Sequence, residues 1–110
     1  MSANQGRDLL YIDDIVDALV LLLKAPLPTG EIINIGAGRE YVMADVAATI
    51  VRRRGANIRL IKDTTSRPGE VEHLYCSIEK ARERLGWKPI VDLEKGLQRT
   101  IDSFRQGPDL

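Results

Sequence analysis

The strongest structural signal in the chain is residues 7–23, which read Arg-Asp-Leu-Leu-Tyr-Ile-Asp-Asp-Ile-Val-Asp-Ala-Leu-Val-Leu-Leu-Leu. Arg7–Ile12 is apolar or aromatic after its first two residues, which predicts a short strand. Asp13 and Asp14 follow at a position where carboxylates cap the free N–H groups of a helix. The residues after them are apolar on almost every face, so the sequence predicts that helix Ile15–Leu23 is buried on several sides.

Downstream of this stretch, strand-like and helix-like patterns alternate. Apolar residues without strict alternation are typical of a strand covered on both faces, and a one-sided apolar stripe predicts an amphipathic helix. The fold class is therefore α/β, or an α+β-like fragment, with four helices and three or four short strands in a single domain over residues 1–110. The further predicted elements are the strands Glu31–Gly36, Ile58–Ile61 and Val71–Cys76 and the helices Ala44–Arg54, the one beginning after Ser77, and Leu93–Arg105.

Composition excludes several classes of protein. The chain has 110 residues and 12.3 kDa, with 16 Lys plus Arg against 16 Asp plus Glu, so it lacks the cationic surplus that binding to a nucleic-acid backbone needs. It has one Cys and one His, which excludes an internal disulfide and makes a His/Cys zinc site unexpected. No apolar run approaches the roughly 18 residues of a membrane span, and no secretory signal is visible. We expect a cytoplasmic protein without nucleic-acid or membrane partners.

Four motifs stand in a recognisable order. They are Arg7-Asp-Leu-Leu-Tyr-Ile-Asp-Asp14, Ile33-Asn-Ile-Gly-Ala-Gly38, Arg67-Pro-Gly-Glu70, and Ser77 through Pro89 followed by Leu93-Glu-Lys-Gly-Leu97. Together they resemble the C-terminal portion of an extended short-chain dehydrogenase/reductase (SDR), and in particular the NAD-dependent nucleotide-sugar epimerases and dehydratases such as UDP-glucose 4-epimerase. The resemblance covers the chain from Gln5 to Phe104. It implies that Ile32–Ile35 is an edge strand of a large parallel sheet in a full-length enzyme.

The resemblance also implies a substrate-binding site. The family binds the diphosphate of its sugar nucleotide with arginines at the positions of Arg7 and Arg67, and guanidinium groups fork onto phosphate oxygens. The acid of the Arg-Pro-Gly-Asp loop binds the ribose hydroxyls; here it is Glu70, one methylene longer. We expect the strands Arg7–Ile12 and Val71–Cys76 to pair in a small separate sheet that brings Arg7 near Arg67.

The family's dinucleotide fingerprint and its catalytic Tyr-x-x-x-Lys are missing from the chain. Gly36-Ala-Gly38 lacks the third glycine of the fingerprint, and Tyr11, Tyr41 and Tyr75 are not followed by a lysine four residues on. We therefore assign no catalytic, cofactor-binding or metal-binding residue. NAD is a cofactor of the full-length family, and the chain alone is expected to show no turnover of a nucleotide sugar, with or without added NAD.

Other residues have simpler structural explanations. Adjacent residues of a helix point about 100° apart, so Asp13 and Asp14 are interpreted as caps rather than as a catalytic pair. His73 has no titrating partner nearby in sequence, and Cys76 lies in an apolar stretch, where an inert buried thiol is expected. Trp87 is predicted to close the core, and Arg52–Arg54 to form a solvated helix end.

Three hypotheses remain open on sequence grounds. The first is a truncated or split substrate-binding module, completed by a separate chain that supplies the dinucleotide-binding domain. The second is a non-enzymatic interaction or structural protein that reuses the fold as an oligomer. The third is a truncated reading frame or an expressed piece of a longer protein. Exposed edges and apolar helices invite pairing, so we expect a homodimer. Its contact is predicted to centre on Leu19, Leu22, Leu23, Ile33 and Ile35.

Overall fold

The structure, a computed structural model, describes residues 2–55, 57–65 and 67–106. Within them lie four helices and three strands of two residues each, which confirms the predicted α/β class, the four helices and the small number of short strands. In chain order the elements are β1 (Gly6–Arg7), α1 (Ile12–Lys24), β2 (Tyr41–Val42), α2 (Met43–Arg54), β3 (His73–Leu74), α3 (Glu79–Leu85) and α4 (Leu93–Gln106).

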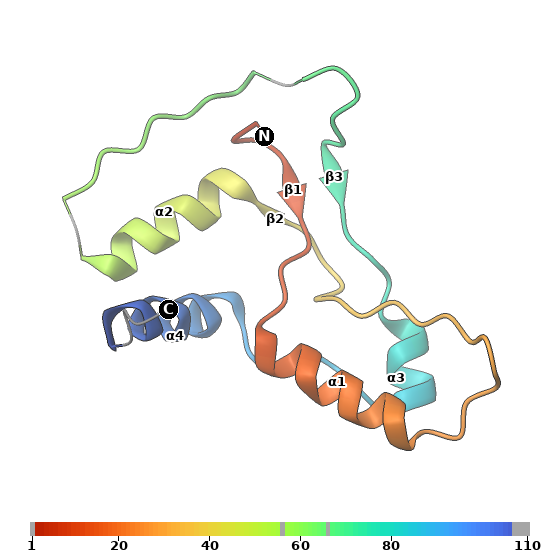
Figure 1. The fold of residues 1–110 in the computed structure, drawn as a ribbon. Helices are drawn as coiled ribbons and strands as arrows, with labels where there is room; N and C mark the ends of the chain where they lie inside the picture. The colour runs from red at the N-terminus through yellow and green to blue at the C-terminus, as the bar shows by residue number, and fades with distance from the viewer. Residues whose placement is uncertain (1, 56, 66, 107–110) are drawn as a thin grey trace.

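The three strands form one small sheet in the order β2-β1-β3 (Figure 1). β1 pairs antiparallel with β2, Gly6 opposite Val42, and parallel with β3, Gly6 opposite His73. The predicted pairing of the first strand with the Val71–Cys76 region is therefore confirmed, although each strand is shorter than its apolar run. The strand β2 was not predicted, because it is only two residues long and leads directly into α2.

Gly6 lies at a point of the sheet where the side chain of Glu40 approaches the central strand closely. A Cβ atom built on Gly6 would lie 2.5 Å from Glu40 Oε2. The same carboxylate lies 3.1 Å from Nδ1 of His73, so a residue just before β2 meets a residue of β3 across the central strand. The sequence analysis looked for a titrating partner of His73 only nearby in sequence, and Glu40, its partner in the structure, is 33 residues away.

The buried core lies between α1 and α3, on the right of Figure 1. Trp87 closes it as predicted, and its Nε1–H donates to the backbone oxygen of Asp14 at 3.0 Å. Gly86, in the left-handed conformation at φ 64°, ends α3 and lets the chain turn back toward α1. The buried apolar residues of this cluster are Ala18, Ile78, Ala81, Leu85 and Trp87.

Two predicted strands are absent from the part of the chain that is described. Residues 32–35 and 58–61 have no ladder partner and are not strands. A strand is defined by its neighbour, and apolar character alone does not supply one. Ile33 and Ile35 pack partly against the core, while Ile32 is 78% exposed and its backbone oxygen accepts a hydrogen bond from Lys80 Nζ at 2.6 Å.

The start of α1 differs from the prediction. Tyr11 is the N-cap residue and no side chain caps the helix, so Asp13 and Asp14 do not act as caps. Asp14 is 1% exposed, and its carboxylate accepts hydrogen bonds from the backbone N–H groups of Ile90 and Val91 at 3.2 and 3.1 Å. Asp14 thus ties the first turn of α1 to the segment that leads into α4.

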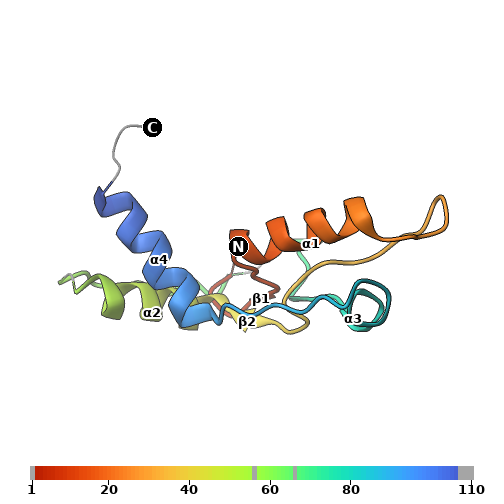
Figure 2. The same ribbon diagram turned by 90° about the horizontal axis from the view of Figure 1, so that it is seen from below.

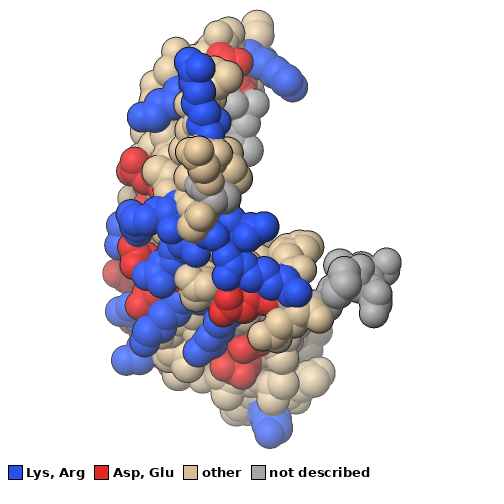
Figure 3. Space-filling model, turned by 90° about the vertical axis from the view of Figure 1, so that its left-hand side faces the viewer, with Lys and Arg blue, Asp and Glu red and all other residues tan. Residues whose placement is uncertain are grey.

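Helices α2 and α4 lie against each other on the opposite side of the molecule (Figure 2). Arg52 and Arg53 at the end of α2 both pair with the Glu94 carboxylate of α4, so the arginine run is not simply a solvated helix end. Lysines and arginines gather on this face with acidic side chains among them (Figure 3). Its mixed charge agrees with the absence of a net cationic surplus.

The molecule is open rather than close-packed. Its Cα radius of gyration is 16.7 Å and its extents are 50 × 39 × 23 Å. A compact domain of this length has a radius of about 13 Å. Its accessible surface of 8142 Å² also exceeds, by about 2,000 Å², the area expected for a compact monomer of its mass. Only Asp14 and Ala18 of α1 are buried, although the sequence predicts burial of this helix on several sides.

Candidate functional site

The central strand positions Arg7. The Nη1 atom of Arg7 donates to the backbone oxygens of Gly6 and Glu72 at 2.8 and 3.5 Å, and Nη2 donates to Oε1 of Gln5 at 3.2 Å. The guanidinium therefore lies along the junction of β1 with the segment that enters β3. Three contacts to oxygen atoms fix its orientation, and its positive charge is not neutralised by any of them.

Arg67 and Glu70 form the two ends of a turn just before β3. The backbone N–H of Arg67 donates to Glu70 Oε2 at 2.9 Å, and the backbone N–H of Glu70 donates to the oxygen of Arg67 at 3.1 Å. The hydrogen bond from Arg67 N–H lowers the pKa of Glu70, and Gln5 acts in the same direction. The Glu70 carboxylate is thereby kept ionised, and an ionised carboxylate can accept hydrogen bonds from ribose hydroxyls.

The sheet brings Arg7 close to the segment that follows Glu70. Because β1 and β3 run parallel and in register, the turn at 67–70 leads into the strand beside Arg7. Arg7 already reaches the backbone of Glu72, two residues after Glu70. The assignment of Arg7, Arg67 and Glu70 to a substrate remains a prediction.

Asp8 is the residue of this region that the sequence analysis missed. Its carboxylate accepts hydrogen bonds from the backbone N–H groups of Ala37 at 2.7 Å, Gly38 at 3.2 Å and Cys76 at 3.4 Å. These donors belong to two segments 29 to 68 residues away in sequence. Asp8 therefore fastens the glycine turn and the chain after β3 to the end of β1. Its position beside Arg7 in the motif was the only signal available in advance.

The same contacts test whether the glycine turn fits NAD. A dinucleotide site needs free backbone N–H groups to receive the pyrophosphate. The N–H groups of Ala37 and Gly38 already donate to the Asp8 carboxylate, so they are not free to receive a phosphate. The turn at residues 36–38 therefore does not fit the cofactor's pyrophosphate, and no step of a redox reaction can be derived from it.

Cys76 is the only cysteine and lies beside Asp8. Burial raises the pKa of the Cys76 thiol, and the negative charge of Asp8, whose Oδ2 is 3.7 Å from Sγ, raises it further. The thiol is therefore held protonated, which agrees with the interpretation of Cys76 as inert.

Asp8→Asn is expected to lower the pKa of Cys76 toward its ordinary value, because the substitution removes the neighbouring charge while keeping one oxygen as an acceptor. The midpoint of the pH profile for alkylation of Cys76 by iodoacetamide measures this shift. The limiting rate at high pH should not change, which separates a charge effect from exposure of the thiol. Asp45→Asn, at an exposed position of α2, is the control, and an unshifted midpoint in Asp8→Asn would contradict the prediction.

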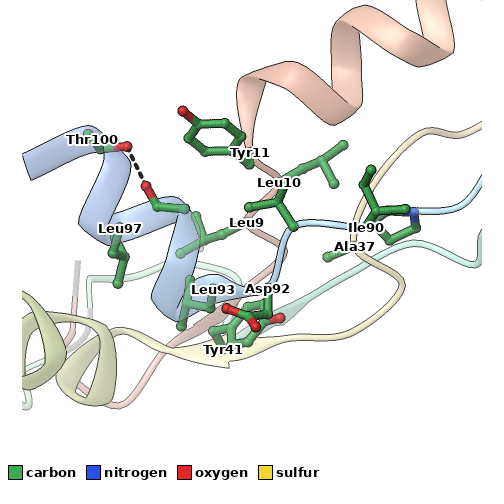
Figure 4. A pocket seen from close by; sticks show the side chains of 13 residues that line it. Leu9, Leu10, Tyr11, Ala37, Tyr41, Ile90, Asp92, Leu93, Leu97 and Thr100 are labelled. Atoms are coloured by element: carbon green, nitrogen blue, oxygen red, sulfur yellow. Dashed lines mark hydrogen bonds between the residues drawn. The ribbon is translucent and has the colours of Figure 1, made fainter. Parts of the chain in front are cut away.

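A separate apolar pocket lies between the residues before α1 and the first turns of α4 (Figure 4). Its volume is about 360 Å³, and Leu9, Leu10, Leu93 and Leu97 supply much of its wall. Gly96 allows Tyr11 to pack on α4, because a Cβ at this position would lie 3.1 Å from the tyrosine ring. Arg7, Arg67 and Glu70 do not line this pocket, so it is distinct from the predicted phosphate site.

Other kinds of site receive no support from the described residues. Residues 2–55, 57–65 and 67–106 contain no group of three or more His, Cys, Asp or Glu side chains arranged to hold a metal ion. None of the helices in these ranges has the length and hydropathy needed to cross a membrane.

Comparison with known sequences shows which protein family the chain resembles. Residues 2–100 match the family model of GDP-mannose 4,6 dehydratase. The chain is 37% identical over 99 residues to a putative UDP-glucose 4-epimerase of Methanocaldococcus jannaschii, covering 90% of this chain and 31% of that protein. It is 39% identical to a GDP-L-fucose synthase of Sinorhizobium fredii, covering 94% of this chain and 32% of that protein. The chain thus spans about a third of the length of the curated relatives it matches.

Comparison with solved structures gives the same answer. The UDP-glucose 4-epimerase of Thermotoga maritima, solved with UDP-glucose, superimposes with a TM-score of 0.85 at 31% identity, over 97% of this chain and 34% of that one. Bordetella bronchiseptica WbmF, solved with NAD+ and UDP, gives 0.79 at 30% identity, over 94% of this chain and 30% of that one. The chain therefore belongs to the family of GDP-mannose 4,6-dehydratase, within the nucleotide-sugar epimerases and dehydratases of the extended SDR class.

Proposed function

We propose that this chain is the substrate-binding portion of a nucleotide-sugar epimerase or dehydratase. Arg7 and Arg67 bind the diphosphate of a nucleotide sugar, and Glu70 accepts hydrogen bonds from its ribose. The observation that carries the proposal is the parallel, in-register pairing of β1 with β3. Arg7 is in β1, and the turn that contains Arg67 and Glu70 leads into β3. The relative from Thermotoga maritima was solved with UDP-glucose and WbmF with UDP, which supports this class of ligand.

The proposal assigns the redox chemistry to a part of the enzyme outside residues 1–110. The N–H groups of the glycine turn at 36–38 donate to the Asp8 carboxylate. The matched relatives are about three times as long as the segment they share with this chain. A dinucleotide-binding domain that supplies NAD and the proton-transfer residues completes the enzyme, either as a separate chain or as part of a longer one.

Arg67→Ala is expected to weaken binding of UDP by about 1–3 kcal/mol, the cost of losing a charge-assisted hydrogen bond to phosphate. Wild-type binding should weaken as salt is raised, because the exposed arginine is screened. Isothermal titration calorimetry measures both effects. Arg59→Ala, which removes an exposed arginine elsewhere, should leave the affinity unchanged. Equal affinity in wild type and Arg67→Ala would remove Arg67 from the site.

A second candidate function is an oligomeric, non-enzymatic protein that reuses the fold. One observation favours it: α1 carries an exposed apolar face on a molecule that is already open. A second copy of the chain is the partner that this candidate requires. The residues of the face are Ile12, Val16, Leu19, Val20 and Leu23.

A further inference from the structure

Gln5 is a buried polar side chain whose role neither the motifs nor the comparisons assign. It is 1% exposed, and its backbone is fixed on both sides, since its N–H donates to Ser2 O at 3.1 Å and its oxygen accepts from Met43 N–H at 2.9 Å. Only its amide remains to be explained. A buried amide is costly unless it makes hydrogen bonds, so both ends of this one need a reason.

The oxygen and the nitrogen of the Gln5 amide differ in their hydrogen bonding. Oε1 accepts a hydrogen bond from Arg7 Nη2 at 3.2 Å. Nε2 is buried without a hydrogen-bond partner of good geometry among the described residues. A buried donor left in this state is destabilising, so a purely structural residue at this position would be better apolar.

The backbone places Glu70 within reach of this unused donor. The next residue, Gly6, donates its N–H to Glu72 O at 2.8 Å, which holds the end of the 67–70 turn against the Gln5 segment. Gln5 also lies close enough to lower the pKa of the Glu70 carboxyl. The amide therefore stands between the cation and the anion of the proposed substrate site.

We propose that Gln5 is a positioning residue that couples Arg7 to Glu70: its Oε1 orients the guanidinium for the ligand's phosphate, and its Nε2–H orients the Glu70 carboxylate. This inference rests on the proposed function for its ligand, a nucleoside diphosphate. The part of the inference that concerns Gln5 and Glu70 does not depend on any ligand. Gln5 touches neither phosphate nor sugar, and it acts through Arg7 and Glu70.

The test compares two variants of Gln5. Gln5→Met keeps the length of the side chain but removes both hydrogen-bonding ends. We expect its stability to denaturant to equal or exceed that of wild type, because an apolar side chain replaces a buried amide whose Nε2 has no hydrogen-bond partner of good geometry. We expect its affinity for UDP to fall about tenfold. Gln5→Glu retains an oxygen for Arg7 but turns a second carboxylate toward Glu70. It should therefore bind UDP poorly at neutral pH and recover as the pH falls and a carboxyl group is protonated.

A ligand-free measurement separates this inference from the proposed function. Titration of the Glu70 carboxyl carbon by NMR should give a higher pKa in Gln5→Met than in wild type, because the amide no longer favours the ionised form. Gln98→Met on α4 is the control and should leave both readouts unchanged.

Two results would overturn the role of Gln5. One is a Glu70 pKa that is the same in Gln5→Met as in wild type. The other is a wild-type protein that binds UDP and a Gln5→Met protein that binds it equally well. If the wild type does not bind UDP at all, the proposed function fails, while the positioning of Glu70 by Gln5 is still decided by the titration.

Discussion

Asp14→Ala is expected to lower the free energy of unfolding by about 2–5 kcal/mol. The wild-type carboxylate is 1% exposed and accepts two backbone hydrogen bonds, from Ile90 and Val91. Alanine leaves both N–H groups without an acceptor and leaves a small cavity beside Trp87, whose indole donates to the Asp14 backbone. Urea unfolding followed by Trp87 fluorescence measures the change.

Asp13→Ala is the matched control. Asp13 is the preceding residue, carries the same charge, and is exposed. It lies in the first turn of α1, where the positive end of the helix dipole favours its charge only weakly, so its removal should cost no more than a few tenths of a kcal/mol. If the two variants lose the same stability, the buried hydrogen bonds of Asp14 do not hold the α4 segment to α1.

The helices could be predicted from the sequence because their signal is local. Apolar residues at helical spacing and a glycine after the last turn depend on neighbours within the same helix, and Gly55 and Gly86 do end α2 and α3 in the left-handed conformation. The strands could be predicted only in part. Ile32–Ile35 and Ile58–Ile61 are apolar but have no adjacent strand in the described chain, and pairing is a property of two segments.

The residues of the candidate site also differ in whether their signal is local in sequence. Arg7, Arg67 and Glu70 were found through two motifs, each of which spans only a few adjacent residues. Asp8, which fastens distant segments to the end of β1, and Gln5, whose side chain contacts Arg7, were not found in this way. Asp8 binds backbone groups up to 68 residues away, and the burial of Gln5 depends on β1 lying in the centre of the sheet. Charge and motif thus identify candidate ligand-binding residues better than residues whose role depends on contacts between distant segments.

The open shape of the molecule bears on its state of assembly. The surface in excess of a compact monomer, about 2,000 Å², is more than the roughly 800 Å² that each partner buries in a standard protein interface. Part of it is the apolar face of α1, where Leu23 is 87% and Leu19 is 55% exposed. Leu22, Ile33 and Ile35, which were predicted to lie in the contact, instead pack partly against the core. We therefore place the contact on Leu19, Leu23 and the exposed Ile32.

The chain is expected to form a twofold dimer at micromolar concentration through this face. Pairing two copies of α1 removes apolar surface from water on both, and a twofold arrangement closes the assembly so that it does not continue into a filament. Analytical ultracentrifugation should give a species of about twice 12.3 kDa. A single species of 12.3 kDa would show that α1 does not mediate self-association.

Leu23→Lys separates the contact from the fold. Because the side chain is almost fully exposed within one copy, lysine there should not lower the stability of the monomer, but in a dimer it would place an unpaired charge in an apolar interface. We expect it to shift the protein to the monomer. Ile61→Lys, at a position 84% exposed and away from α1, is the control and should remain dimeric. Ile33→Lys does not serve this purpose, since Ile33 packs against the core and its replacement would unfold the chain whether or not it dimerises.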